Sequence, residues 1–109
     1  MNNKKDDVYY LGKIVKDIDF IAAHINGIQK EDLENDEVLL DSMQFRLIQI
    51  SENANKLSEN FKRKHTDIDW HEIYGLRNWI VHDYGNVSYD IIFSTLTNDI
   101  QPLKEKLLS

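Results

Sequence analysis

Apolar residues recur at steps of three and four along two long stretches of this chain. Such steps gather side chains on one face of an α-helix, whereas a half-buried strand would alternate at every second residue. The first stretch predicts a helix over about residues 6–26, with apolar positions Leu11, Ile14, Ile18, Ile21, Ile25 and Ile28. The second predicts a helix of about six turns, with apolar positions Leu40, Met43, Leu47, Ile50, Ala54, Leu57 and Phe61. We therefore expect two long amphipathic helices.

Helix-capping and helix-breaking residues delimit the neighbouring elements. Gly27 is well placed to end the first helix, and the charged segment 30–36 should form a turn or a short helix. Ser88 can cap a later helix that bears Tyr89, Ile92 and Leu96. Pro102 then interrupts the pattern, so the chain should finish with a short last helix or a kinked continuation.

A further helix is predicted between these elements, from about residue 70 to residue 84. Side chains in the segment 66–69 can cap its start, and Gly85 suits the left-handed position past its end. Only four glycines and one proline punctuate the chain, which favours long helices over short strands. We predict an all-α fold: a single domain over residues 1–109, built as an antiparallel bundle of four to five helices.

The charge and cysteine content narrow the class of function. Acidic residues outnumber basic ones by 19 to 13, giving a net charge of −6. This balance weighs against broad, non-specific nucleic-acid binding, but it allows one local positive groove. Without cysteine, disulfides, thiolate metal sites and cysteine nucleophiles are excluded. No apolar run is long enough to span a bilayer and no secretory leader is recognisable, so we expect a soluble, cytoplasmic protein without membrane contact.

Two apolar residues fall outside the apolar face of the second long helix. Phe45 and Ile48 would require that helix to bury a second surface. One small domain has limited interior for both surfaces, so the pattern hints at dimerisation. Scattered apolar residues are also common on the surfaces of monomers.

The predicted helix over residues 70–84 bears the residues best suited to chemistry. At about 100° per residue, its apolar residues share one face, and Arg77 falls near the middle of that face. A guanidinium keeps its charge, so Arg77 needs either a partner acid or an open groove. His82 lies about 140° from Arg77 and one turn after Asn78. An imidazole titrates near neutral pH and can act as a general acid or base.

Structural roles explain the same residues when each is taken singly. Arg77 could pair with Glu52 or with another acid on the second long helix. His82, in a last helical turn, would interact favourably with the helix dipole. Tyr84 could be a core aromatic residue with a satisfied hydroxyl. Taken one by one, these interpretations are favoured over catalytic ones.

The motif and its surroundings shift that balance. The spacing of Arg77, four residues, His82, one residue and Tyr84 resembles the Arg-x4-His-x-Tyr signature of HepT-like HEPN proteins. The segments 70–78 (WHEIYGLRN) and 50–58 (ISENANKLS) also resemble that family. The resemblance covers nearly the whole chain in the same helical order. It implies a HEPN-like bundle and a metal-independent endoribonuclease toxin, working as a homodimer with the motifs of both protomers facing one cleft.

The resemblance also implies a role for each matching residue. His82 would be the general acid or base, and Arg77 would hold the scissile phosphate. Asn78 would add a hydrogen bond or orient His82. Tyr84 would accept AMP from a partner nucleotidyltransferase of the MNT type, the antitoxin, and the added negative charge beside Arg77 would repel RNA. No cofactor is implied.

A short basic run precedes the motif. Lys62, Arg63 and Lys64 are candidate RNA contacts, although a charge run is usually a solvated face. The histidines show no metal-ligand spacing, and no glycine-rich phosphate loop is present. Two other hypotheses stay open. The chain could be a non-catalytic helical partner or substrate of a nucleotidyltransferase, which the net acidity favours, or an interaction domain in which the motif only stabilises the bundle.

Overall fold

The computed structural model describes residues 5–83, 86 and 88–109, and in this part of the chain the regular structure is entirely helical. The predicted all-α class is therefore confirmed. Two short helices, α2 and α4, and a division of the last helix raise the number of described elements above the predicted four to five. The elements are α1 (Asp7–Ile25), α2 (Lys30–Asn35), α3 (Glu37–Asn55), α4 (Glu59–Arg63), α5 (Trp70–His82), α6 (Tyr89–Ser94), the π-helical segment η1 (Thr95–Asp99) and α7 (Ile100–Leu107).

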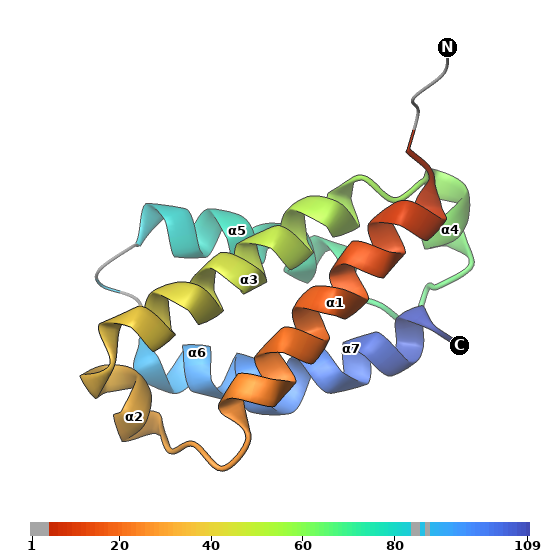
Figure 1. The fold of residues 1–109 in the computed structure, drawn as a ribbon. Helices are drawn as coiled ribbons and strands as arrows, with labels where there is room; N and C mark the ends of the chain where they lie inside the picture. The colour runs from red at the N-terminus through yellow and green to blue at the C-terminus, as the bar shows by residue number, and fades with distance from the viewer. Residues whose placement is uncertain (1–4, 84–85, 87) are drawn as a thin grey trace.

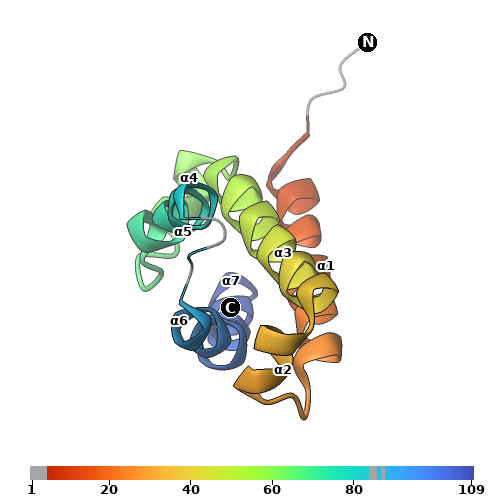
Figure 2. The same ribbon diagram turned by 90° about the vertical axis from the view of Figure 1, so that its left-hand side faces the viewer.

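The longer elements surround one core in an antiparallel arrangement. α1, α3, α5 and the joined α6, η1 and α7 run in alternating directions (Figure 1). α3 lies between α1 and α5 and packs against both (Figure 2). The two predicted apolar faces form much of the core, with fully buried residues that include Ile14, Ile18, Ile21, Met43, Leu47 and Ile50. α3 therefore contributes to the core and also forms the surface against which α5 packs.

The second long helix is shorter than predicted. α3 ends at Asn55 and α4 begins at Glu59, although the apolar spacing continues to Phe61. Ser58 caps α4, because its Oγ accepts a hydrogen bond from the Phe61 amide at 3.1 Å. The amide and hydroxyl of Ser58 in turn donate to Oδ1 and Oδ2 of Asp7, at 2.8 and 2.6 Å. The break depends on a residue of α1, which the local apolar pattern cannot reveal.

The predicted interruption at Pro102 takes the form of a π turn. Pro102 has no amide to donate to the carbonyl of Asn98, and its ring would crowd that carbonyl in a regular helix. The wider η1 segment immediately before α7 accommodates this mismatch. The Thr95 hydroxyl donates to the Ile91 carbonyl at 2.8 Å, in addition to the Thr95 amide, at the junction of α6 and η1.

α5 faces the core with a different side from the one predicted. Ile80 is fully buried, and Ile73 and Leu76 pack partly buried against the core. Along the chain these three residues are spaced by three and then four residues, so they lie on the inward side of the helix. Arg77 is half-buried beside them, and Val81 is exposed. The prediction that Arg77 lies in the middle of the inward face was wrong, because Leu76 and Trp79 also pack against the core and the inward face is therefore rotated away from Arg77.

No helix in the described ranges combines the length and the apolarity needed to cross a bilayer.

Candidate active site

An open cleft of about 350 Å³ lies between α3 and α5. Each helix contributes three side chains at positions one, three or four residues apart, which places them on one side of the helix. Because α3 and α5 pack together, the two polar edges face each other. The described lining residues are Ser51, Glu52 and Asn55 from α3, and Tyr74, Arg77 and Asn78 from α5.

Arg77 is held by hydrogen bonds from both walls of the cleft. Its Nε donates to Oε1 of Glu52 at 2.9 Å, and its Nη1 donates to Oδ1 of Asn78 at 3.2 Å. The Arg77 and Glu52 side chains are 43% and 44% exposed, so the pair lies at the solvent-facing surface. The sequence left two alternatives for Arg77, a partner acid or an open groove. Both are observed, because Arg77 is paired with Glu52 and also lines an open cleft.

His82 occupies the last turn of α5 and is exposed. It follows Asn78 by four residues, which puts the two side chains on the same side of the helix. His82 is absent from the described residues that line the cleft. One chain therefore brings Arg77 and Asn78 together and leaves His82 beyond the end of their cleft. Tyr84, the remaining residue of the motif, lies outside the described residues.

The basic run reaches the cleft through Lys62. Its Nζ donates to the backbone carbonyl of Asn55 at 3.4 Å and lies 5.0 Å from the centroid of the Tyr74 ring. Asn55 and Tyr74 both line the cleft. Arg63 and Lys64 are exposed near the end of α4. At least one of the three candidate RNA contacts therefore stands at the edge of the cleft.

The position of Lys62 depends on how α4 is attached to α1. The hydroxyl and amide of Ser58 donate to the Asp7 carboxylate, and these bonds lower the pKa of Asp7 below its ordinary value of 3.8. The charge of Lys62 acts in the same direction, while partial burial opposes it. The Asp7 carboxylate thus stays ionised at neutral pH and fixes the start of the helix that bears Lys62.

Three residues of the cleft, Ser51, Asn55 and Tyr74, had been assigned no role from the sequence. Tyr74 precedes Arg77 by three residues and Asn55 follows Glu52 by three, so helical spacing alone places each beside its neighbour. The Tyr74 hydroxyl is buried and has no hydrogen-bond partner in the described structure. The Ser51 hydroxyl donates to the Ile73 carbonyl at 2.8 Å and ties α5 to α3.

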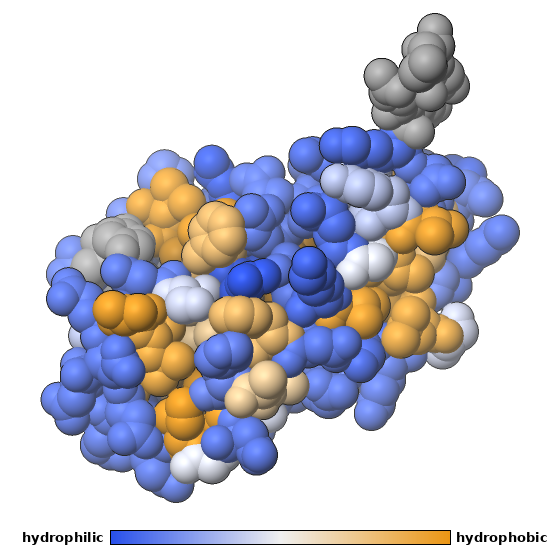
Figure 3. Space-filling model, viewed as in Figure 1, coloured by the Kyte–Doolittle hydropathy of each residue, from blue (hydrophilic) through white to orange (hydrophobic). Residues whose placement is uncertain are grey.

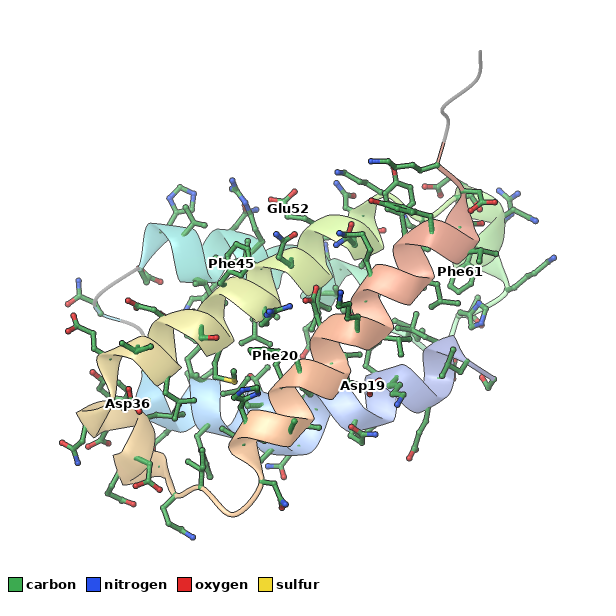
Figure 4. All side chains as sticks on the ribbon, in the orientation of Figure 1. Asp19, Phe20, Asp36, Phe45, Glu52 and Phe61 are labelled. Carbon is green, nitrogen blue, oxygen red and sulfur yellow. The ribbon has the colours of Figure 1, made fainter. Side chains whose placement is uncertain are left out.

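Exposed apolar side chains continue the same surface. Phe45 is 54% exposed and Val81 is 43% exposed. Phe45 lies two turns before Glu52 on one side of α3, the side next to α5 (Figure 4). Val81 lies one turn after Arg77 on α5, and apolar atoms gather over this part of the surface (Figure 3). Ile48, the other residue predicted off the apolar face, packs against the core instead.

Within the described ranges, no group of three or more histidine, aspartate or glutamate side chains is arranged to hold a metal ion.

A family model and individual relatives all relate this chain to ribonucleases. The family model described as Ribonuclease HepT-like matches residues 14–109. A candidate RNase of Caldanaerobacter subterraneus subsp. tengcongensis is 33% identical over 98 residues, covering 90% of this chain and 88% of that protein. A protein of Thermococcus cleftensis named as a probable ribonuclease HepT is 30% identical over 107 residues, covering 94% of each chain. A candidate RNase of Methanocaldococcus jannaschii is 21% identical over 105 residues, covering 96% of each. No solved structure matches this chain significantly.

Proposed function

This chain belongs to the HepT-like family of ribonucleases, and from that premise we propose that it is the toxin of a toxin–antitoxin pair. In this proposal it is an endoribonuclease that cleaves RNA without a metal ion, in a cleft shared by two copies of the chain. The observation that supports this best is the placement of Arg77 and Asn78 in an open cleft, with His82 exposed one turn later.

Arg77 binds the phosphate that is cleaved. A guanidinium has five N–H donors, and in the described structure Glu52 and Asn78 each engage one of them. The other donors remain for phosphate oxygens, with which arginine forms strong, charge-assisted hydrogen bonds. Charge that accumulates on these oxygens during the reaction is stabilised by the same contacts. Asn78 orients the guanidinium through its amide oxygen.

His82 transfers protons. One imidazole takes the proton of the ribose 2′-hydroxyl, whose oxygen then forms a bond to phosphorus. The bond between phosphorus and the 5′-oxygen breaks, and that oxygen receives a proton from a second imidazole in its protonated form. The products are a 2′,3′-cyclic phosphate and a 5′-hydroxyl. Two copies of the chain supply the two imidazoles that such a reaction uses.

In a homodimer, the second copy supplies an imidazole to the cleft. His82 lies beyond the cleft of its own chain, so a second copy is needed to bring an imidazole opposite Arg77. Phe45 and Val81 offer exposed apolar surface beside the cleft, which a twofold contact would bury. Lys62, at the edge of the cleft, binds a neighbouring phosphate of the RNA.

The antitoxin in this proposal is a nucleotidyltransferase of the MNT type. It transfers AMP from ATP to the hydroxyl of Tyr84, two residues after His82 in the sequence, and releases pyrophosphate and the hydroxyl proton. The added phosphate places negative charge near Arg77, where it competes with the RNA phosphate and repels the rest of the strand. A gene for a short nucleotidyltransferase beside that of this chain would favour this pairing.

The cleavage chemistry is tested by incubating the purified, unmodified dimer with cellular RNA in excess EDTA and identifying the ends of the products. We expect fragments with 2′,3′-cyclic phosphate and 5′-hydroxyl ends. If the dimer leaves every cellular RNA intact under these conditions, with or without divalent cations, the catalytic proposal fails and a role as a non-catalytic partner of the nucleotidyltransferase replaces it.

The toxin–antitoxin pairing requires a test in cells. Expression of this chain should arrest growth, and co-expression of the neighbouring nucleotidyltransferase should relieve the arrest. A Tyr84→Phe variant should remain toxic in the presence of the nucleotidyltransferase, because it lacks the accepting hydroxyl. Relief of the arrest for Tyr84→Phe as well would contradict the assignment of Tyr84.

A further inference from the structure

Glu52 is an acidic side chain in a cleft that is proposed to bind a polyanion. A carboxylate at that place repels RNA, so it weakens substrate binding unless it has another effect. Its ion pair with Arg77 contributes little to folding, because both partners are more than two-fifths exposed and such surface pairs are weak. Neither attraction of the substrate nor stability of the fold therefore explains why a glutamate stands at position 52.

The geometry of the pair offers a different account. The Glu52 carboxylate receives its bond from Nε, at the inner edge of the guanidinium, and Asn78 receives one bond from Nη1. In the described structure these contacts fix the plane of the guanidinium from two directions. They engage two of the five N–H groups, and the remaining three, two on Nη2 and one on Nη1, can bind phosphate oxygens. We infer that Glu52 is a positioning residue, which holds Arg77 in the orientation that binds the scissile phosphate.

Glu52 is well placed for this role because α3 is the better anchored of the two helices. Its neighbours Ser51 and Asn53 are buried, and the core packs along α3 from Met43 to Ala54. In α5, by contrast, Ile80 is the residue described as fully buried. An arginine side chain has many rotamers, and the carboxylate on α3 restricts them to those that direct the guanidinium along the cleft.

This inference rests on the proposed contact between Arg77 and phosphate, and it adds a residue outside the Arg-x4-His-x-Tyr motif. It predicts that the reach and the acceptor atom of residue 52 matter more than its charge. Glutamine keeps an oxygen that can accept from Nε but removes the charge. Aspartate keeps the charge but is one methylene shorter and cannot make the same contact without movement of a helix.

The test compares four variants of the full-length dimer, Glu52→Gln, Glu52→Asp, Glu52→Ala and the control Asp19→Ala. Asp19 forms another exposed ion pair between helices, with Lys104 Nζ at 2.7 Å, away from the cleft. We measure kcat and KM for RNA cleavage, RNA binding with a 2′-O-methylated strand, and the thermal midpoint of unfolding. We expect Glu52→Ala and Glu52→Asp to lower kcat by about 10- to 100-fold, as misplacement of a substrate-binding group does. Glu52→Gln and Asp19→Ala should stay close to wild type.

A double-mutant cycle separates positioning from other effects. In an Arg77→Ala background, Glu52→Ala should cause no further loss of activity, because no guanidinium remains to be held. Wild-type activity for both Glu52→Ala and Glu52→Asp would overturn the inference, as would tighter RNA binding with faster cleavage, which would make Glu52 a competitor of the phosphate. Should Glu52→Ala fail to fold, the other two variants still test the inference, which predicts a higher kcat for Glu52→Gln than for Glu52→Asp. Full activity of Arg77→Ala and His82→Ala is a separate result, which would refute the proposed function itself.

Discussion

The basic run at residues 62–64 shows how an acidic protein can carry positive side chains where RNA is proposed to bind. The chain carries a net charge of −6, yet the Lys62 ammonium lies at the edge of the cleft that contains Arg77. Lys62 contacts the Tyr74 ring and the Asn55 carbonyl, and it also forms an ion pair with Glu59, with Nζ and Oε1 3.7 Å apart. Lys62 and Arg77 thus place two cations at the cleft, each with a glutamate partner, on a molecule whose overall field repels RNA.

We expect Lys62→Ala to weaken RNA binding and to reduce its salt dependence. Removing one phosphate contact should lower the slope of log K against log salt by about 0.7 to 1. The measurement is a titration of RNA binding at several salt concentrations with a non-cleavable strand. Lys16→Ala is the matched control, because Lys16 is exposed on α1, on the far side of α3 from α5 (Figure 2). An equal change of slope in both variants would show that Lys62 acts only through net charge.

At the level of residues, the sequence predicted part of the cleft. The pairing of Arg77 with Glu52 was one of its stated alternatives, and helical spacing correctly related Asn78 to His82. Contact of Lys62 with Asn55 and Tyr74 could not be foreseen, because it depends on how α4 turns back toward α5. The catalytic roles of Arg77, Asn78 and His82 remain predictions that only activity measurements can decide.

Among the elements, the break between α3 and α4 matters most for the site. It sets the direction of α4 and therefore the position of Lys62. The predicted start and end of α1 agree with the structure to within one residue, because Asp6 and Gly27 are strong local signals. The α3 end was wrong because Leu57 and Phe61 keep the helical period, while the hydrogen bonds of Ser58 run to Asp7, 51 residues away. Long-range polar contacts of this kind leave no trace in apolar spacing.

The bond between Asp7 and Ser58 gives a prediction about pH. Folding lowers the pKa of Asp7 from its ordinary value of 3.8, since Ser58 binds the ionised form. The carboxylate therefore stabilises the fold above pH 4 or so, and this contribution is lost as the pH falls through the lowered pKa. We expect Asp7→Ala to reduce the free energy of unfolding by about 1 kcal/mol at pH 7 and by much less near pH 2. Urea unfolding at both pH values measures the two differences.

Asp7 also lies in the first turn of α1, where any acid interacts favourably with the helix dipole. Glu37 occupies the corresponding first position of α3, so Glu37→Ala serves as the control for that effect. The loss caused by Asp7→Ala at pH 7 should exceed the loss caused by Glu37→Ala. Equal losses would show that the bonds to Ser58 contribute nothing beyond the dipole.

For the whole molecule, the antiparallel bundle places the cleft on one flank of α3 and the first helix on the other. The sequence predicted this architecture from two apolar faces and few breaks, and the structure confirms it. It hinted at a second apolar surface, and Phe45 with Val81 provides one beside the cleft. A second copy bound there would cover apolar surface and complete the site in one step.

Phe45→Glu should convert the proposed dimer into a monomer and abolish cleavage, while the monomer stays folded. A charge at the centre of an apolar contact is costly to bury, whereas the same side chain is well solvated on a free surface. Sedimentation velocity and circular dichroism measure the two properties. Val8→Glu is the control, because Val8 is exposed on α1. A fully active Phe45→Glu monomer would contradict the shared cleft.

The most direct test of the whole account compares two histidines of α5. His82 and His71 are both exposed, one in the last turn and one near the start of the helix, so each can be replaced by alanine at similar structural cost. We measure cleavage of a mixed RNA pool in EDTA by the wild type, His82→Ala and His71→Ala, each checked for folding and dimerisation. The account predicts that His71→Ala cleaves like the wild type and that His82→Ala does not cleave. Undiminished cleavage by a folded, dimeric His82→Ala would contradict it.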